Sequence, residues 1–248
     1  MSPLSIFPLS GVPLVARGSD LAALVLDALA ASGLTLQAGD VVALAQKIVS
    51  KVEGRQVRLA DVTPSPRAAE LAAQCDKDPR LVELILSETD EVMRVRPGVL
   101  IVRHRLGLVL ANAGIDQSNI DHADGPTALL LPLDPDATAA RLRDELGADC
   151  AVLIIDSLGR AWRQGTIGTA IGASGLSALL DLRGQPDLYG RKLETSDLGL
   201  ADEIAAAASL AMGQAGEGTP IVLVRGLSAS GEGRAADLVR PRALDLFP

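Results

Sequence analysis

Three short aliphatic runs constrain the fold more than any other feature of this sequence. They lie at 41–45, 151–155 and 221–224, and each is typical of a buried strand. Segments with helical spacing separate them without a regular strand–helix alternation, which favours an α+β fold over a doubly wound parallel sheet. Residues 98–114 predict a hairpin or meander, in which 106–110 form a further buried strand.

Apolar residues at helical spacing predict five helices. The first, at 20–32, begins at Asp20 as its N-cap and is ended by Gly33. The others are expected at 133–147, with Pro135 or Asp136 in the first turn and Gly147 at the end, at 200–220, where glycines close the helix, and at two segments between 64 and 89 that are divided near Pro79.

The length and the charge of the chain limit its organisation and its partners. A chain of 248 residues forms one large domain or two small lobes. Hydrophobic residues make up 48% but aromatic residues only 2%, so Ala, Val, Leu and Ile must form the core. The net charge is −8, and there is no long basic block and no aromatic cluster for base stacking. We therefore expect no nucleic-acid partner.

The cysteines and the termini indicate a cytoplasmic protein. Cys75 and Cys150 lie far apart without metal-ligand spacing and are expected to be reduced core thiols. The N-terminus does not resemble a signal peptide, and no apolar stretch reaches 18 residues, so no membrane association is expected. Residues 228–248 are polar and rich in Gly, Arg and Pro, which predicts an arm or a poorly packed end.

Oxygen-bearing side chains follow two of the apolar segments. Asp116 lies in "ANAGIDQSNID", which also holds Ser118, Asn119 and Asp121, and Asp156–Ser157 follow the strand at 151–155. Carboxylates and hydroxyls are ligands that Mg²⁺ and Mn²⁺ prefer, with substrate phosphates completing the coordination shell. A shared metal site is one interpretation, and turn or capping residues are the other.

Cationic residues form two further groups. Lys47 and Lys51 are four apart, so they point the same way on a helix and on a strand alike, and they repel each other unless an anion lies between them. A phosphate chain would fit there, although a solvated face explains the spacing equally well. Arg160 and Arg163 precede a glycine-rich stretch whose backbone N–H groups could approach an anion. This stretch matches neither the P-loop nor the dinucleotide-binding fingerprint.

The two histidines offer no recognisable catalytic arrangement. His104 and His122 lack a metal-binding partner at helical spacing, and neither accompanies a G-x-S-x-G nucleophile. Both are expected to be ordinary core or surface residues, so the sequence does not support hydrolysis by a Ser–His–Asp triad.

Five segments taken together resemble one known family. In chain order they are "AQKIVSKVEGR", "RLGLVLANAGIDQSNID", "LLPLDPDATA", "IDSLGRAWRQGTIGTAIGASGL" and "MGQAGEGTPIVLVRGL". They resemble the CofE family, the coenzyme F420-0:L-glutamate (gamma-glutamyl) ligases, from about Gly11 to Leu227. The resemblance implies a ligase domain at 1–227 with a C-terminal tail at 228–248, an α+β fold of two lobes, and an intertwined homodimer.

The resemblance also implies the residues of the active site. Asp116, Asp156, Ser157, where the family usually has threonine, and Gln214 correspond to metal ligands, and Lys51 and Arg160 join the two acids as catalytic residues. The residues expected to bind GTP are Val12, Pro13, Leu14, Val15, Gln46, Lys51, Asn119, Met212, Gly213, Gln214, Ala215, Gly216, Glu217, Gly218 and Thr219.

The activity implied is the GTP-dependent addition of one or more gamma-linked glutamates to coenzyme F420-0, with Mg²⁺ or Mn²⁺, and K⁺ as a further cation. An acyl phosphate would be the intermediate. We expect a locally positive cleft despite the net charge of −8. Two alternatives remain: a related ligase acting on another acid acceptor, and a nucleotide-binding module without catalysis.

Overall fold

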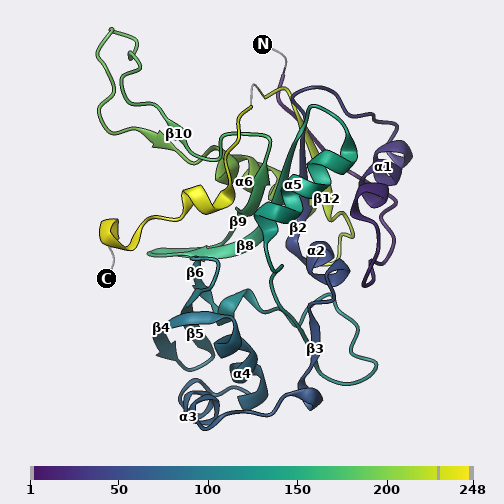
Figure 1. Ribbon diagram of the computed structural model, residues 1–248, viewed down its shortest axis with the longest axis vertical. Coiled ribbons are helices and arrows are strands. Elements are labelled where there is room, and N and C mark those ends of the chain that lie inside the picture. Colours follow the sequence, from purple (N-terminus) through teal and green to yellow (C-terminus); the bar gives the residue numbers. More distant parts are fainter. Residues whose placement is uncertain (1–2, 228–229, 246–248) are drawn as a thin grey trace.

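A five-stranded sheet lies at the centre of the protein (Figure 1). The computed structural model describes residues 3–227 and 230–245. The three aliphatic runs predicted from the sequence are confirmed as the three inner strands, and β2 and β8 pair in parallel while the other neighbours are antiparallel. In spatial order the strands are β1 (Ser5–Pro8), β12 (Ile221–Arg225), β2 (Val41–Ala45), β8 (Ala151–Arg160) and β9 (Arg163–Ser174).

Helices cover both faces of this sheet (Figure 1). α1 (Leu21–Ala31) and α5 (Pro135–Leu146) pack on one face, and α6 (Leu200–Met212) packs on the other. Successive residues of β8 alternate between the two cores because side chains of a strand point to opposite faces. Both cores are almost entirely aliphatic, as the composition predicted.

The helix starts depend on local capping. Asp20 accepts a hydrogen bond from the backbone N–H of Ala23 at 3.0 Å, which confirms it as the N-cap of α1. The N-cap of α5 is Asp134, which accepts from the N–H of Ala137, so Pro135 occupies the first turn as predicted. Gly147 ends α5 with φ of +61°.

Residues 56–129 form an inserted segment between β2 and β8, which lies at the bottom of Figure 1. It has apolar clusters of its own, built mainly from its helices and its meander. The two helices divided near Pro79 and the meander are confirmed. The elements are β3 (Gln56–Arg58) paired with β7 (Thr127–Leu129), α3 (Pro66–Cys75), α4 (Pro79–Ser87), and the meander β4 (Thr89–Arg96), β5 (Val99–His104) and β6 (Val109–Ala111).

The strand predicted at 106–110 is wrong in its position. Gly107, with φ of +84°, donates its N–H to the carbonyl of His104 and closes a turn, so β6 begins only at Val109. Leu106 and Leu108 are partly buried against the main core from this turn, which explains their apolar character.

The glycine-rich stretch after Arg163 is a strand rather than an anion-binding loop. It forms β9, and a Cβ at Gly168 would collide with the backbone of Ala205 in α6. A Cβ at Gly172 would meet the carbonyl of Pro135 in α5. These two glycines therefore allow helices to approach the strand closely from both faces.

The described part of the C-terminal segment docks on the body of the protein. Ala235 is buried in the same core as α6, and its N–H donates to the carboxylate of Asp136 at 2.8 Å. Asp136 also accepts from the N–H of Ala173 in β9. The segment is therefore held at Ala235, although 240–245 are exposed, as the expectation of a poorly packed end requires. Residues 1–2, 228–229 and 246–248 lie outside the described residues.

A hairpin-like arm projects from the body between β10 (Leu180–Asp181) and β11 (Asp197–Leu198), at the upper left of Figure 1. The side chains at its tip, Leu188 and Tyr189, are 99% and 96% exposed. Asp187 orders the tip because its carboxylate accepts from the N–H groups of Tyr189 and Arg191.

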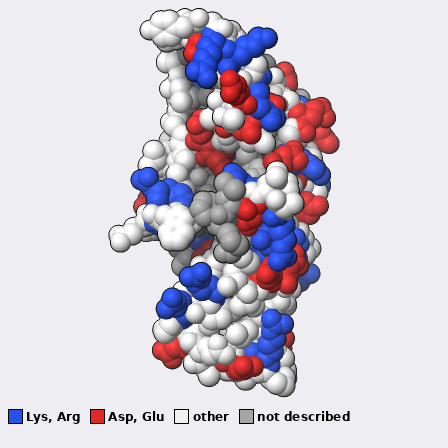
Figure 2. Space-filling view, turned by 90° about the vertical axis from the view of Figure 1, so that its left-hand side faces the viewer, with Lys and Arg blue, Asp and Glu red and all other residues white. Residues whose placement is uncertain are grey.

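The mixture of sheets and helices confirms the α+β class, whereas the two lobes and the intertwined homodimer stay predictions. Cys75 and Cys150 are buried and free, as expected. Across the described ranges, no helix has the length and apolar character needed to cross a membrane. On the face drawn in Figure 2, Lys and Arg side chains are interspersed with Asp and Glu.

Candidate functional site

The candidate site lies where β2 ends and its parallel neighbour β8 continues. Ala45 pairs with Ile155, after which Gln46 begins α2 (Gln46–Val52) while β8 runs on to Arg160. Asp156 and Ser157 are therefore within β8 and not at its end, because β9 keeps pairing with them. The region beyond the carboxyl ends of parallel strands is a common place for ligands.

Asp116 reaches this place from the inserted segment. Its backbone forms a bridge with Leu129 of β7, with hydrogen bonds of 2.8 and 3.0 Å, so it is not a turn residue. Its Oδ2 lies 2.9 Å from Nζ of Lys47 and accepts from Nε2 of Gln46 at 3.2 Å. Gln46 is buried, and its Oε1 accepts from the hydroxyl of Ser50. The amide nitrogen of Gln46 thus holds Asp116, while Ser50 holds the amide oxygen and fixes the orientation of the side chain.

The two carboxylates of the site repel each other. Burial and the neighbouring charge of Asp116 raise the pKa of Asp156 to about 6, although the N–H of Ser157, Lys47 and Gln46 all act in the opposite direction. The ammonium group of Lys47 thus only partly offsets the negative charge of the two carboxylates. The structure brings together Asp116 and Asp156, as predicted, and explains neither as a cap.

Ser157 and Gln214 meet on the other side of β8. The hydroxyl of Ser157 donates to Oε1 of Gln214 at 2.6 Å, and Nε2 of Gln214 donates to the hydroxyl of Ser209 at 2.7 Å. Ser209 lies in the last turn of α6, and Gly213, with φ of +79°, ends that helix. The helix end therefore presents the Gln214 oxygen directly to Ser157.

A cavity of about 810 Å³ adjoins these groups. It is lined by all of the residues predicted to bind GTP, together with Asp156 and Ser157. Asp116 contacts the cavity through Lys47 and Gln46, which both line it. The structure thus gathers five separate segments of the chain at one place, while the roles of their residues stay predictions.

The two lysines of α2 both face this cavity and are not a solvated surface. Nζ of Lys51 donates to the carbonyl of Asn119 at 2.7 Å, and burial together with Lys47 lowers the pKa of Lys51. Nδ2 of Asn119 in turn donates to the carbonyl of Ala215 at 3.0 Å. Asn119 therefore connects the loop after Asp116 with the loop after α6.

Arg160 and Arg163 are the predicted site residues that the structure does not bring to the cavity. They pair with each other at the exposed turn between β8 and β9, and neither lines the cavity. The expectation of a locally positive cleft is also wrong. The charged residues of the lining are three cations, Arg17, Lys47 and Lys51, and three acids, Asp121, Asp156 and Glu217.

The donor set fits a hard divalent cation. The carboxylates of Asp116 and Asp156 lie near each other, and the Ser157 hydroxyl and the Gln214 amide oxygen meet on the other side of β8 beside the same cavity. Mg²⁺ commonly takes one or two protein carboxylates and completes its shell with phosphates and water. A cation between Asp116 and Asp156 would remove the repulsion that raises the pKa of Asp156. Among the described residues no group of three or more His, Cys, Asp and Glu could hold a metal, so a metal centre would depend on these two acids.

Three polar residues of the lining were not predicted from the sequence: Ser209, whose hydroxyl accepts from Gln214, and Arg17 and Gln56. Arg17 lies two residues after Val15, and Gln56 begins β3 close behind α2. Neither carries a motif that marks it, because only the packing of the chain brings them to the cavity. His122, as expected, is an exposed residue that accepts from the N–H of Thr127 through Nδ1.

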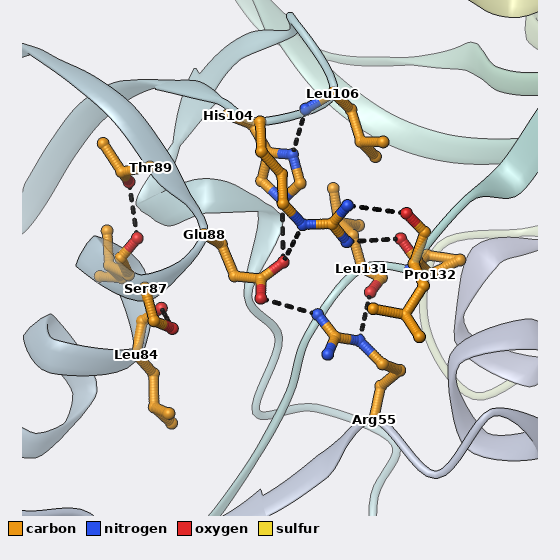
Figure 3. A network of polar contacts seen from close by, with 12 residues as sticks. Arg55, Leu84, Ser87, Glu88, Thr89, His104, Leu106, Leu131 and Pro132 are labelled. Atoms are coloured by element: carbon orange, nitrogen blue, oxygen red, sulfur yellow. Dashed lines mark hydrogen bonds and ion pairs between the residues drawn. The ribbon is translucent and has the colours of Figure 1, made fainter.

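A second polar cluster, around Glu88, lies outside the cavity (Figure 3). Oε1 of Glu88 is 2.8 Å from Arg55, and Oε2 is 3.0 Å from Arg105. Nδ1 of the buried His104 accepts from the N–H of Leu106, so the other ring nitrogen presents its proton to Glu88. Burial opposes ionisation, yet His104 and the two guanidinium groups together lower the pKa of Glu88 to about 2.

This cluster joins the inserted segment to the rest of the chain. Nε of Arg55 donates to the carbonyl of Leu131 at 2.9 Å, and Arg105 donates to the carbonyls of Pro132 and Leu133. Residues that flank the segment on both sides are therefore tied to Glu88 at the end of α4, Arg55 directly and 131–133 through the two arginines. His104 is a core histidine, as the sequence indicated.

Comparison with known proteins identifies relatives over nearly the whole chain. Residues 11–226 match the family model described as F420-0:Gamma-glutamyl ligase. The protein named coenzyme F420:L-glutamate ligase from Methanothermobacter thermautotrophicus is 45% identical over 98% of both chains. A protein of the same name from Methanopyrus kandleri is 43% identical over 100% of both chains. Another from Archaeoglobus fulgidus is 42% identical over 98% of this chain and 96% of its own.

Proposed function

The chain belongs to the F420-0:gamma-glutamyl ligase family, and from this premise we propose that it joins L-glutamate to coenzyme F420-0 at the cavity beside Asp156. The observation that carries the proposal is the convergence of five separate segments on one cavity. They contribute Asp156, two lysines and a glycine-rich loop, and Asp116 lies against one of these lysines; these are the groups that a nucleotide-dependent ligase requires.

Activation of the acceptor is the first chemical requirement. A carboxylate is a poor acyl donor because hydroxide leaves badly, so we propose that GTP supplies the leaving group. A carboxylate oxygen of the acceptor attacks the γ-phosphorus, the bond to GDP breaks, and an acyl phosphate forms. The glutamate amine then attacks the acyl carbon, phosphate leaves with the bonding electrons, and the nitrogen loses a proton to give the amide.

The residues of the chain act mainly by positioning charge. Lys51, held by the carbonyl of Asn119, faces the cavity where a phosphate chain would lie, and Lys47 is one turn away. Asp116, Asp156, Ser157 and Gln214 would hold Mg²⁺ or Mn²⁺, which supplies neutralisation of the phosphate charge. A requirement for K⁺ is proposed from the family resemblance alone. The segment 213–218 and the stretch 12–15 would enclose the nucleotide.

The test is a direct measurement of the product. The protein is incubated with GTP, Mn²⁺, L-glutamate and F420-0, and the coenzyme is examined by mass spectrometry for the added mass of glutamate. Formation of the product together with GDP and phosphate supports the proposal. GTP binding without GDP formation would instead indicate a nucleotide-binding module. GDP formation only with another acid would indicate a related ligase with a different acceptor.

We further propose that the protein is a homodimer in which the arm takes part. Leu188 and Tyr189 stand almost fully exposed on an ordered tip, and covering such side chains with a second copy would remove apolar area from water. Replacing both by serine is expected to shift the protein from dimer to monomer, as measured by light scattering. A dimer that survives this change would reject the role of the arm.

A further inference from the structure

Lys47 occupies the position at which a metal would approach Asp116. Its Nζ lies 2.9 Å from Oδ2 of Asp116, and the two side chains are 28% and 29% exposed, so the pair is shielded from bulk water on most sides. An ammonium group and a divalent cation cannot both sit against the same carboxylate oxygen at contact distance, since like charges repel strongly there. Lys47 therefore competes with any cation that uses this oxygen.

The other partner of this oxygen cannot move away as easily. Gln46 donates to Oδ2 of Asp116 from a side chain that is 1% exposed, and its Oε1 is held by the hydroxyl of Ser50 at 2.9 Å. Lys47 has a long flexible stem and lies at the edge of the cavity. Of the two donors on this oxygen, Lys47 is the one that can be displaced.

The cavity offers Lys47 an alternative partner when it is occupied by an anion. Lys47 and Lys51 lie one helical turn apart on α2 and both line the cavity. Lys51 is already engaged with the carbonyl of Asn119. A phosphate chain beside α2 would attract the Lys47 ammonium away from Asp116, and the freed oxygen would then accept the metal.

We propose that Lys47 is an internal substitute for the metal: it neutralises Asp116 in the metal-free protein and passes to the nucleotide phosphates when the divalent cation binds. The inference rests on the proposed function for the assignment of Asp116 as a metal ligand. It makes Lys47 a positioning residue that weakens metal binding in the absence of nucleotide. Binding of the nucleotide and binding of the divalent cation would therefore favour each other.

The test is the affinity of the purified full chain for Mn²⁺ alone, measured by the electron paramagnetic resonance signal of free Mn²⁺. Lys47→Met removes the charge at similar length and is expected to raise the affinity at least about fivefold, the lower end of typical coupling between linked binding events. Lys47→Gln should act in the same direction. Lys47→Arg keeps the charge and should bind Mn²⁺ as weakly as the unaltered protein.

Lys51→Met is the matched control. It removes the same charge from the same face of α2, but Lys51 contacts a backbone carbonyl and not an acid. Its effect on Mn²⁺ affinity should therefore be clearly smaller than that of Lys47→Met. Equal increases from both changes would overturn the inference, because they would show a general effect of charge rather than competition for Asp116.

Asp116→Asn separates failure of this inference from failure of the proposed site. Loss of Mn²⁺ binding in Asp116→Asn, combined with unchanged affinity in both Lys47→Met and Lys47→Gln, would overturn the inference and leave the site assignment intact. Unchanged Mn²⁺ binding in Asp116→Asn would reject both. A second readout is thermal: Mn²⁺ should raise the melting temperature of Lys47→Met more than that of the unaltered protein.

Discussion

Two carboxylates of this protein, Glu88 and Asp156, have opposite surroundings. Glu88 faces two guanidinium groups and an imidazole N–H, which lower its pKa to about 2 despite burial. Asp156 faces Asp116 and shares one ammonium group with it, and burial together with this repulsion raises its pKa to about 6. The same chemical group is thus strongly stabilised as an anion in one place and destabilised in the other.

The difference separates a structural cluster from a candidate active site. Around Glu88 cations outnumber acids, and every partner also holds a backbone group, which joins the inserted segment to the rest of the chain. Around Asp156 acids outnumber cations, and a cavity lies beside them. An excess of like charge that is retained at a cost in stability is typical of functional sites.

The largest expected effect is on catalysis. Asp156→Asn should lower the rate of glutamate incorporation about a thousandfold or more, because the loss of a proposed metal ligand would remove several kcal/mol of charge stabilisation. The same change should raise the melting temperature of the metal-free protein at pH 8, because it removes the repulsion with Asp116. Mass spectrometry of the product measures the rate, and calorimetry measures the melting temperature. Full activity of Asp156→Asn would show that the site is assigned wrongly.

The next effect is on stability. Glu88→Gln should lower the free energy of unfolding by about 3 kcal/mol, because two partly buried guanidinium groups lose their acid. Urea denaturation measures the change. Glu145→Gln is the control, since its pair with Arg141 is about half exposed and should contribute less than about 1 kcal/mol. Equal losses from both variants would contradict the comparison.

The pH dependence of stability should differ in sign between the two acids. Because the pKa of Glu88 is lowered from 4.5 to about 2, its stabilisation is complete above pH 4.5 and is lost as the pH falls toward 2. Because the pKa of Asp156 is raised from 3.8 to about 6, the protein loses stability as the pH rises from about 4 to 6. The free energy of unfolding is measured against pH for the unaltered protein, Glu88→Gln and Asp156→Asn, and the difference between the unaltered protein and each variant isolates the contribution of that acid. Contributions that change with pH in the same direction would refute the assignment.

The smallest expected effect is that of the metal on stability. Mn²⁺ at about one hundred times its dissociation constant should stabilise the protein by about 2.7 kcal/mol, through binding to the folded state. Asp156→Asn should not respond, and Glu88→Gln should respond as the unaltered protein does. A thermal scan with and without Mn²⁺ measures this stabilisation. Loss of the stabilisation in Glu88→Gln would indicate that the metal binds at Glu88 and not at Asp156.

Local signals predicted the elements well. The aliphatic runs became inner strands, Asp20 capped α1, Pro79 divided two helices, and Gly147 ended α5. These features depend on a few neighbouring residues, since a cap or a strand pattern is satisfied within one or two turns of chain. Every residue that the motif resemblance assigned to the GTP site likewise lines one cavity, because the order of the motifs along the chain is itself information.

Contacts between distant segments were not predictable in the same way. Asp136 looked like a first-turn acid, but its carboxylate holds β9 and the C-terminal segment. Gly168 looked like part of an anion-binding loop, but it allows α6 to approach β9. The charge of the cavity was also misjudged, since Arg160 and Arg163 lie elsewhere and Asp121 and Glu217 line it.

The order of residues by itself determined the inner strands, the helix ends, the aliphatic core and the family, because each follows from short-range chemistry or from motifs in series. Only the tertiary structure decided that Lys47 lies against Asp116 and which cations reach the cavity. It also decided that the pKa of Asp156 is raised while the pKa of Glu88 is lowered. The reason is physical: the energy of a charge depends on the distance to other charges and on its exposure to water, and folding sets both.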